Sequence, residues 1–174
     1  PLYSSAASDV YKRQGDANSP SFGQSVAVSD DGTRVVIGSL DLGEGPDWLS
    51  HAQVHEWDGS AWQQLDNNIS VTATNPTLFG FSVAISGDGN RIAVGDFYGP
   101  DGLNSGGIGV AENGPEDSPP GAVRIFGWDG STWQQVGETI EGTGAAAEGS
   151  PEFFGVSVAL SSDGERVIAG SALQ

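Results

Sequence analysis

Polar and apolar residues alternate in short runs along this chain, and turn-forming residues separate the runs. Residues 25–29 have the sequence Ser-Val-Ala-Val-Ser, and residues 34–37 have the sequence Arg-Val-Val-Ile. Alternation with a period of two is typical of a β-strand with one buried face. Asp31-Gly32 lies between the two runs, and Asp-Gly favours a hairpin because glycine tolerates the positive φ of such turns. The pattern therefore predicts a β-hairpin.

This hairpin sequence recurs along the chain. Phe-Gly-x-Ser-Val-Ala, a short turn and an apolar run begin at Phe22, Phe79 and Phe154. A second hairpin, Trp-Asp-Gly-Ser-x-Trp, begins at Trp57 and again at Trp128, and the two kinds alternate. The equal spacing predicts that the two Trp of each copy face each other across the hairpin as packing anchors. One repeating unit therefore contains four short strands.

Four short antiparallel strands in a meander describe a blade of a β-propeller. Stacked blades bury both sheet faces, which explains why residues 35–37 are apolar at consecutive positions. A β-sandwich does not require the same hairpin three times, and a β-solenoid repeats at a shorter, more constant period. We predict an all-β fold, a partial β-propeller of about two and a half four-stranded blades. The first blade covers about 22–70, the second about 79–141, and a third begins at about 154–174.

The N-terminal residues 1–14 match no later part of the chain. They resemble an adapter-derived leader of the kind translated at the front of transcriptome-assembled fragments. The alternative is a native N-terminus with little order. We interpret residues 1–14 as a non-native leader and residues 15–174 as a fragment of one β-propeller.

The units differ mainly in their loops. Successive Phe-Gly pairs are 57 and 75 residues apart. In a meander, the turns joining strands 1–2 and 3–4 lie on one side, and the remaining loops lie on the other. Binding usually resides in long loops on a rigid scaffold, so we expect a binding face made by loops 39–52, 66–78, 96–121 and 138–153.

These long loops are strongly acidic. The chain has a formal charge of −17, and the four loops hold 13 acidic residues and no Lys or Arg. Such a surface favours cations or cationic partners, and the alternative is a solvated surface without a partner. The candidate binding residues are acids of the loops that join strands 2 and 3: Asp41, Glu44, Asp47, Asp96, Asp101, Glu112, Glu116 and Asp117.

The Phe-Gly-x-Ser-Val-Ala motif, followed by a turn, an apolar strand and Gly, resembles the FG-GAP repeat of integrin α-chain propellers. The resemblance covers the chain from about residue 20 to its end. It implies a closed ring of blades, with neighbouring blades as partners of this fragment. Of the GAP triplet, only the glycine is kept, as in Gly38-Ser39-Leu40.

Some repeats of that family carry a Ca²⁺ loop between the first two strands. Here the corresponding turn is short, as in Ser-Asp-Asp-Gly-Thr-Arg, and it cannot supply six to eight oxygen ligands. We therefore expect no calcium at these turns and no cofactor. The turn arginines Arg34, Arg91 and Arg166 are expected to pair with the neighbouring turn aspartates.

Residues that could support catalysis are scarce. His51 and His55 are the only histidines, and on an extended segment they would lie roughly 13 Å apart, too far to chelate one metal. We expect them at the surface or in blade packing. The chain has no Cys, and Asn68-Ile69-Ser70 is a possible glycosylation site. The negative charge argues against nucleic acid and anionic membranes, and no apolar run is long enough to insert into a membrane.

The sequence therefore favours a non-enzymatic binding or adhesion module that is extracellular or at the cell surface. Its partner would be a protein or a glycan, with a preference for cationic groups. Two alternatives stay open. The chain could be part of a propeller hydrolase whose catalytic residues lie in other blades, or part of an intracellular scaffold propeller.

Overall fold

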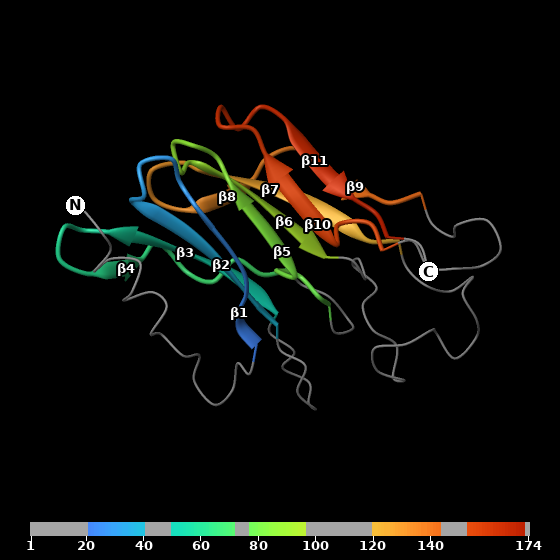
Figure 1. Ribbon diagram of the computed structural model, residues 1–174, viewed down its shortest axis with the longest axis horizontal. Coiled ribbons are helices and arrows are strands. Elements are labelled where there is room, and N and C mark those ends of the chain that lie inside the picture. Colours follow the sequence, from blue (N-terminus) through green and yellow to red (C-terminus); the bar gives the residue numbers. More distant parts are fainter. Residues whose placement is uncertain (1–20, 41–49, 72–76, 97–119, 144–152, 173–174) are drawn as a thin grey trace.

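The computed structural model describes residues 21–40, 50–71, 77–96, 120–143 and 153–172. These residues form antiparallel β-sheets and no helix, so the predicted all-β class is confirmed. Three sheets follow one another along the chain, and we call them the first, second and third units (Figure 1). Within the described residues, no helix is long and apolar enough to cross a membrane.

The first unit is a four-stranded antiparallel meander. Its strands are β1 (Ser21–Val28), β2 (Arg34–Leu40), β3 (His51–Trp57) and β4 (Trp62–Gln64), in that order across the sheet. The end of β2 and the start of β3 therefore lie inside the range 39–52 that the sequence pattern assigned to the first long loop. The predicted meander is confirmed for this unit.

The second unit has the same order with one addition. Its strands are β5 (Ser82–Ile85), β6 (Arg91–Asp96), β7 (Ala122–Trp128), β8 (Trp133–Gln135) and β9 (Ile140–Glu141). Both β8 and β9 pair with β7, on the edge away from β6. They act as one interrupted fourth strand.

The interruption has a counterpart in the first unit. A single bridge joins Ala52 to Ile69 beyond the end of β4. In both units the break contains a left-handed residue: Asp66, with φ of 71°, and Gly137, with φ of 75°. This backbone kink explains why the fourth strand is not continuous.

The third unit is a hairpin of β10 (Ser157–Leu160) and β11 (Val167–Gly170). In all three first hairpins, the glycine of the Asp-Gly turn has a positive φ between 69° and 71°. The Trp pairs also lie as predicted. Trp57 is opposite Trp62 with ring centroids 5.7 Å apart, and Trp128 is opposite Trp133 at 5.4 Å.

The sheets stack face against face, and the cores lie between the units. Val36 and Val54 of the first unit pack in one cluster with Phe79 and Ile92 of the second. Phe79 is fully buried and meets Phe126 edge-on. A second cluster joins the other face of the second unit to the third unit. Each junction therefore buries apolar surface that a single sheet would leave in water.

Glycine permits the close approach of the backbones at each junction. A Cβ on Gly38 would lie 1.9 Å from the carbonyl oxygen of Gly80, and a Cβ on Gly95 would lie 2.1 Å from that of Gly155. The same carbonyls accept hydrogen bonds from serine hydroxyls, from Ser25 at 3.1 Å and Ser82 at 2.7 Å. The glycine and serine positions that recur in the repeat therefore contact one another across the junctions.

Backbone hydrogen bonds also join the turn of each first hairpin to the corresponding turn of the next unit. The amide of Asp30 donates to the carbonyl of Gly87 at 2.9 Å, and the amide of Gly87 donates to the carbonyl of Ser162 at 2.8 Å. The second unit is thus related to the first as the third is to the second.

Candidate functional site

The predicted binding residues fall mostly outside the part of the chain that the structure describes. Seven of the eight lie there: Asp41, Glu44, Asp47, Asp101, Glu112, Glu116 and Asp117. The eighth, Asp96, is the last residue of β6 and has no exposed surface. Its carboxylate therefore does not lie at an exposed loop as the sequence pattern predicted.

The buried carboxylate of Asp96 contacts Leu78 and Arg124. Its Oδ1 accepts a hydrogen bond from the amide of Leu78 at 3.0 Å, and its Oδ2 lies 3.8 Å from Nη1 of Arg124. The Arg124 side chain is only 8% exposed, and its guanidinium stands 6.0 Å from the centre of the Phe79 ring. Burial lowers the pKa of Arg124, and the carboxylates of Asp96 and Glu141 oppose this shift. This is a buried ion pair with a structural role.

The first unit has uncharged residues at the two positions of this ion pair. By the repeat, Ser39 corresponds to Asp96, and Gln53 corresponds to Arg124. Gln53 lies between two buried histidines of β3, with its side-chain amide 3.1 Å from Nε2 of His51 and from Nε2 of His55. The histidines therefore pack within the first unit, one of the two roles expected for them, and they are not at the surface.

The aspartates of the first-hairpin turns accept hydrogen bonds from residues of the same turn. Asp31, Asp88 and Asp163 each accept hydrogen bonds from the serine two residues before and from the amide two residues after. The serine hydroxyl makes the largest contribution to lowering the pKa of all three carboxyls. These carboxylates stabilise the turns in their ionised form.

The Trp hairpins contain a second set of turn aspartates. Asp58 accepts from the amides of Ser60 and Ala61, and Asp129 accepts from the amides of Ser131 and Thr132, all at 2.8 Å. These bonds lower the pKa of Asp58 strongly, and they lower the pKa of Asp129 to about 2. Both carboxylates are Asx-type caps of the turn.

The turn arginines differ from the prediction in two of three units. Arg34 pairs with Glu56 of the neighbouring strand at 2.8 Å and donates to the carbonyl of Gly89 in the next unit at 3.3 Å. Arg91 likewise donates to Gly164 of the next unit at 3.0 Å and pairs with Glu165 at 3.2 Å. The prediction of pairing with the turn aspartate was wrong for both because the arginines reach across the junctions.

Arg166 alone behaves as predicted. It pairs with the turn residue Asp163 at 3.6 Å, and its side chain is 80% exposed. No following unit stands beside it among the described residues, so the junction contact that holds Arg34 and Arg91 has no counterpart here.

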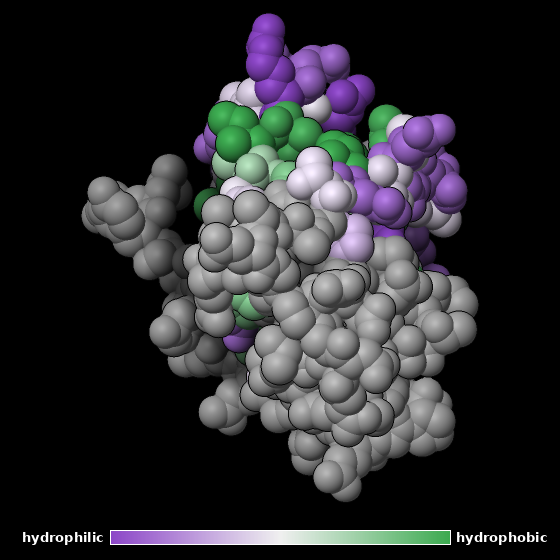
Figure 2. Space-filling view, turned by 90° about the vertical axis from the view of Figure 1, so that its right-hand side faces the viewer, coloured by the Kyte–Doolittle hydropathy of each residue, from purple (hydrophilic) through white to green (hydrophobic). Residues whose placement is uncertain are grey.

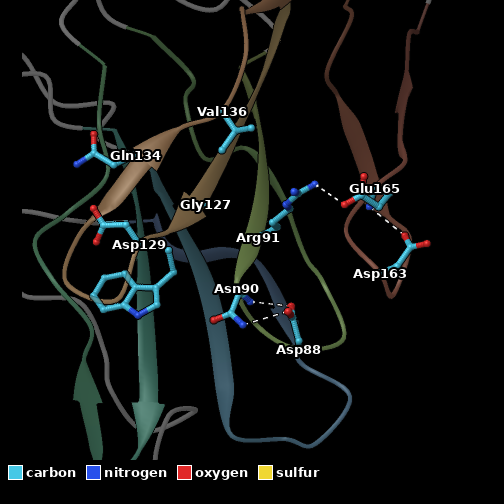
Figure 3. Close-up of a pocket in the computed structure, with 10 residues that line it drawn as sticks. Asp88, Asn90, Arg91, Gly127, Asp129, Gln134, Val136, Asp163 and Glu165 are labelled. Carbon is cyan, nitrogen blue, oxygen red and sulfur yellow. Dashed lines mark hydrogen bonds and ion pairs between the residues drawn. The ribbon is translucent and has the colours of Figure 1, made fainter.

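A recess of about 450 Å³ lies between the turns of the second and third units (Figure 3). Its polar lining is mostly acidic, with Arg91 as the cation, and Arg91 points toward Glu165 in Figure 3. The lining residues are Asp88, Asn90, Arg91, Gly127, Trp128, Asp129, Gln134, Val136, Asp163 and Glu165. An acidic recess beside an indole ring suits a cationic group of a ligand.

One difference between the units lies in the lining of the recess. Glu56 of the first unit corresponds to Gly127 of the second, where the side chain is missing. In the first unit Glu56 therefore holds Arg34, whereas in the second unit Arg91 turns to Glu165 of the next hairpin. The sequence contained this difference, but its consequence depends on the stacking of the units.

The described residues contain no group of three or more His, Asp or Glu side chains placed to hold a metal ion. Asn68 of the possible glycosylation site is exposed, and its Oδ1 accepts a hydrogen bond from Gln64 at 2.9 Å. Models of known protein families and the curated proteins were compared with this chain, and neither comparison gives a match.

The buried ion pair leads to a test that uses the first unit as its template. We expect Asp96→Ser alone to lower the free energy of unfolding by about 3–5 kcal/mol, because it leaves the Arg124 charge buried without its partner. The double variant Asp96→Ser/Arg124→Gln copies Ser39 and Gln53, and we expect it to recover more than half of the loss. Denaturant unfolding measures both. A double variant less stable than Asp96→Ser would contradict a structural ion pair.

The turn aspartates lead to a prediction about acid. The folded pKa of Asp129 is about 2 and lies below the ordinary value of 3.8 for an aspartate, so its stabilising effect is present above about pH 4 and lost as the pH falls toward 2. We expect Asp129→Asn to lower Tm by a few degrees at pH 6, and the difference from wild type to shrink as the pH falls from 4 to 2. Thermal melts monitored by circular dichroism measure this.

Glu138→Gln is the matched control for Asp129→Asn. It removes the same charge from an exposed position outside the turn. It should give little change in Tm at pH 6. A Tm difference for Asp129→Asn that does not change with pH would show that the carboxylate does not cap the turn in its ionised form.

Proposed function

We propose that this chain is part of a β-propeller and acts as a non-enzymatic binding module for a protein or glycan partner with cationic groups. Each unit would be one blade. Support for the propeller comes from the two junctions, which repeat the same serine–glycine contact and the same turn-to-turn hydrogen bond. A constant step between meandering sheets is the geometry by which blades are added around a ring.

One observation carries the proposal of binding by the loops. The polar side chains that recur in every unit are engaged in hydrogen bonds that hold the scaffold. Ser25 and Ser82 bind the backbone of the next unit, Asp31 and Asp88 close turns, and Arg34 spans a junction. Partner recognition then falls to residues that differ between units, and those are the acidic loops.

The acidic loops would all lie on the same side of the sheets. The β1–β2 and β3–β4 turns lie together, since the amide of Trp57 donates to the carbonyl of Thr33 at 2.8 Å. The corresponding bond in the second unit joins Trp128 to Asn90 at 2.9 Å. A meander with these turns on one side sends its long connections to the other. The proposed binding face is therefore opposite the recess in Figure 3.

Two other functions use the same scaffold. A propeller hydrolase would place its catalytic groups in other blades, and an intracellular scaffold would bind its partner with a different surface. Neither is favoured by a specific contact of the described residues. The excess of acidic residues in the loops favours the binding module, and an extracellular or cell-surface location is part of the same proposal.

The test compares two variants with the same change in net charge. Glu116→Gln/Asp117→Asn neutralises a pair in the longest loop, and Asp9→Asn/Asp16→Asn neutralises a pair near the N-terminus. The probe is an immobilised lysine-rich peptide, and biolayer interferometry at 0.15 M salt measures the affinity. We expect the loop variant to bind about threefold or more weakly than wild type, since exposed ion pairs each contribute about 0.2–1 kcal/mol. The N-terminal variant should bind nearly as wild type.

Equal losses in the two variants would mean that the peptide responds to net charge alone, and this would contradict a binding face made by the loops. A further variant, Gly127→Glu, separates the loops from the recess. The new side chain would enter the recess beside Arg91, as Glu56 does beside Arg34. Weaker peptide binding by Gly127→Glu would move the site from the loops to the recess.

A further inference from the structure

Three polar side chains lie in a row on one face of strand β3 in the first unit. His51, Gln53 and His55 occupy alternate positions of the strand, so all three point to the same side of the sheet. His51 is 5% exposed and His55 is 2% exposed. Figure 2 shows the side of the molecule that β9 and β11 occupy, where hydrophilic residues are exposed, whereas β3 lies at the other end in Figure 1. These three residues, which we call the histidine row, are separate from the recess and from the buried ion pair.

The side-chain amide of Gln53 sets the protonation of both rings. It lies 3.1 Å from Nε2 of His51 and 3.1 Å from Nε2 of His55. An amide nitrogen only donates and an amide oxygen only accepts. The nitrogen faces His51, whose Nε2 therefore accepts, and the oxygen faces His55, whose Nε2 therefore donates. Turning the amide over exchanges the two roles but leaves one ring nitrogen of the pair without a proton.

This arrangement limits the charge of the row. A charged histidine carries a proton on both ring nitrogens, so both are donors. One charged ring fits the row, because its Nε2 donates to the amide oxygen while the other ring accepts from the amide nitrogen. Two charged rings do not fit, because one of them would point its N–H at the N–H of the amide. The second charge would then be buried without a hydrogen-bond partner at Nε2, which is costly.

The flanking strands bring no charged side chain to this face among the residues that the structure describes. Residues directly opposite each other in a sheet share a face, so the register identifies the neighbours of the row. They are Val26 and Val28 of β1, Val35, Ile37 and Ser39 of β2, and Gln64 of β4.

The charged groups of the first unit that lie nearest in the sheet are on the opposite face. Arg34 and Glu56 face each other in the register and alternate in step with Val36, which packs against the second unit. Asp66 also faces the second unit, since its Oδ2 accepts from the amide of Trp133 at 3.1 Å. No carboxylate among these groups is placed to pair with a second charge in the row.

We propose that the histidine row makes the first unit sensitive to acid, because the folded row accommodates one charged histidine and not two. Histidine is the side chain that ordinarily gains its charge between pH 8 and 5. In the unfolded chain both rings become charged as the pH falls below about 6.5. The folded row then holds one proton fewer than the unfolded chain. The free energy of unfolding therefore falls with the pH, and the ratio of folded to unfolded protein drops up to about tenfold per pH unit.

This inference is independent of the proposed binding face, since it concerns contacts made within one strand. Nitrogen-15 NMR of the two histidine rings in the full chain, prepared without a histidine tag, tests it without any substitution. The chain has two histidines, so both rings are observed individually. We expect the proton occupancies of the two Nε2 atoms to add up to one in the folded protein from pH 7.5 to 5.5. A sum well above one in the folded protein would overturn the proposal.

The variant Gln53→Glu tests the acid response, because it keeps the shape of the side chain and replaces the donor by a second acceptor. A carboxylate accepts from both rings when both are charged. We expect Tm of wild type to fall by several degrees from pH 7.5 to 5.5 and Tm of Gln53→Glu to rise over the same range. Circular dichroism measures both melts and shows whether the sheets are intact. A wild-type Tm that does not fall, or a folded Gln53→Glu that loses stability as wild type does, would contradict the proposal.

Gln135→Glu is the matched control for Gln53→Glu. It makes the same chemical change at an exposed position of β8, in the second unit, and should follow the pH dependence of wild type. Should Gln53→Glu not fold, His55→Phe replaces it and takes the residue that Phe126 supplies at this position of the second unit. One histidine remains in the row, and it can be charged while donating to Gln53, so we expect Tm of His55→Phe to change little from pH 7.5 to 5.5. An acid response as large as that of wild type would overturn the limit of one charge.

Discussion

The close contact between the backbones of successive units is the interaction on which the rest of this structure depends. At each junction, the carbonyl of a left-handed glycine comes so near to a strand glycine of the preceding unit that a Cβ would lie about 2 Å from the oxygen. The serine hydroxyl beside it binds the same carbonyl. This contact fixes the distance and angle between sheets. The apolar clusters, the arginine bridges and the turn-to-turn hydrogen bonds all depend on that placement.

Much of the fold could be predicted from the sequence because local signals and the repeat agree. The Asp-Gly turns at Gly32 and Gly89 have the positive φ that their pattern required. The Trp pairs face each other because equal spacing within a hairpin fixes the register. These features depend on residues close together in the chain. A single sequence is informative at that range.

The contacts between units could not be predicted in the same way. The glycine of the second strand and the glycine of the Phe-Gly pair recur in the sequence, but nothing in one unit shows that they meet across a junction. The arginines were expected to bind their own turn aspartates, and Arg34 and Arg91 instead reach the next unit. Asp96 was assigned to the long loop 96–121 between the second and third strands, but it is the last residue of β6. Its burial depends on Leu78 and Arg124, which lie far from it in the chain.

The most direct test of the junction compares two glycines at the same position of the repeat. A Cβ on Gly95 would meet both Ser82 and the carbonyl of Gly155, whereas a Cβ on Gly170 would meet only Ser157. Thermal unfolding at low micromolar concentration should therefore show a large loss of stability for Gly95→Ala, about 2–4 kcal/mol more than for Gly170→Ala. Equal losses in the two variants would contradict the claim that this backbone contact holds the units together.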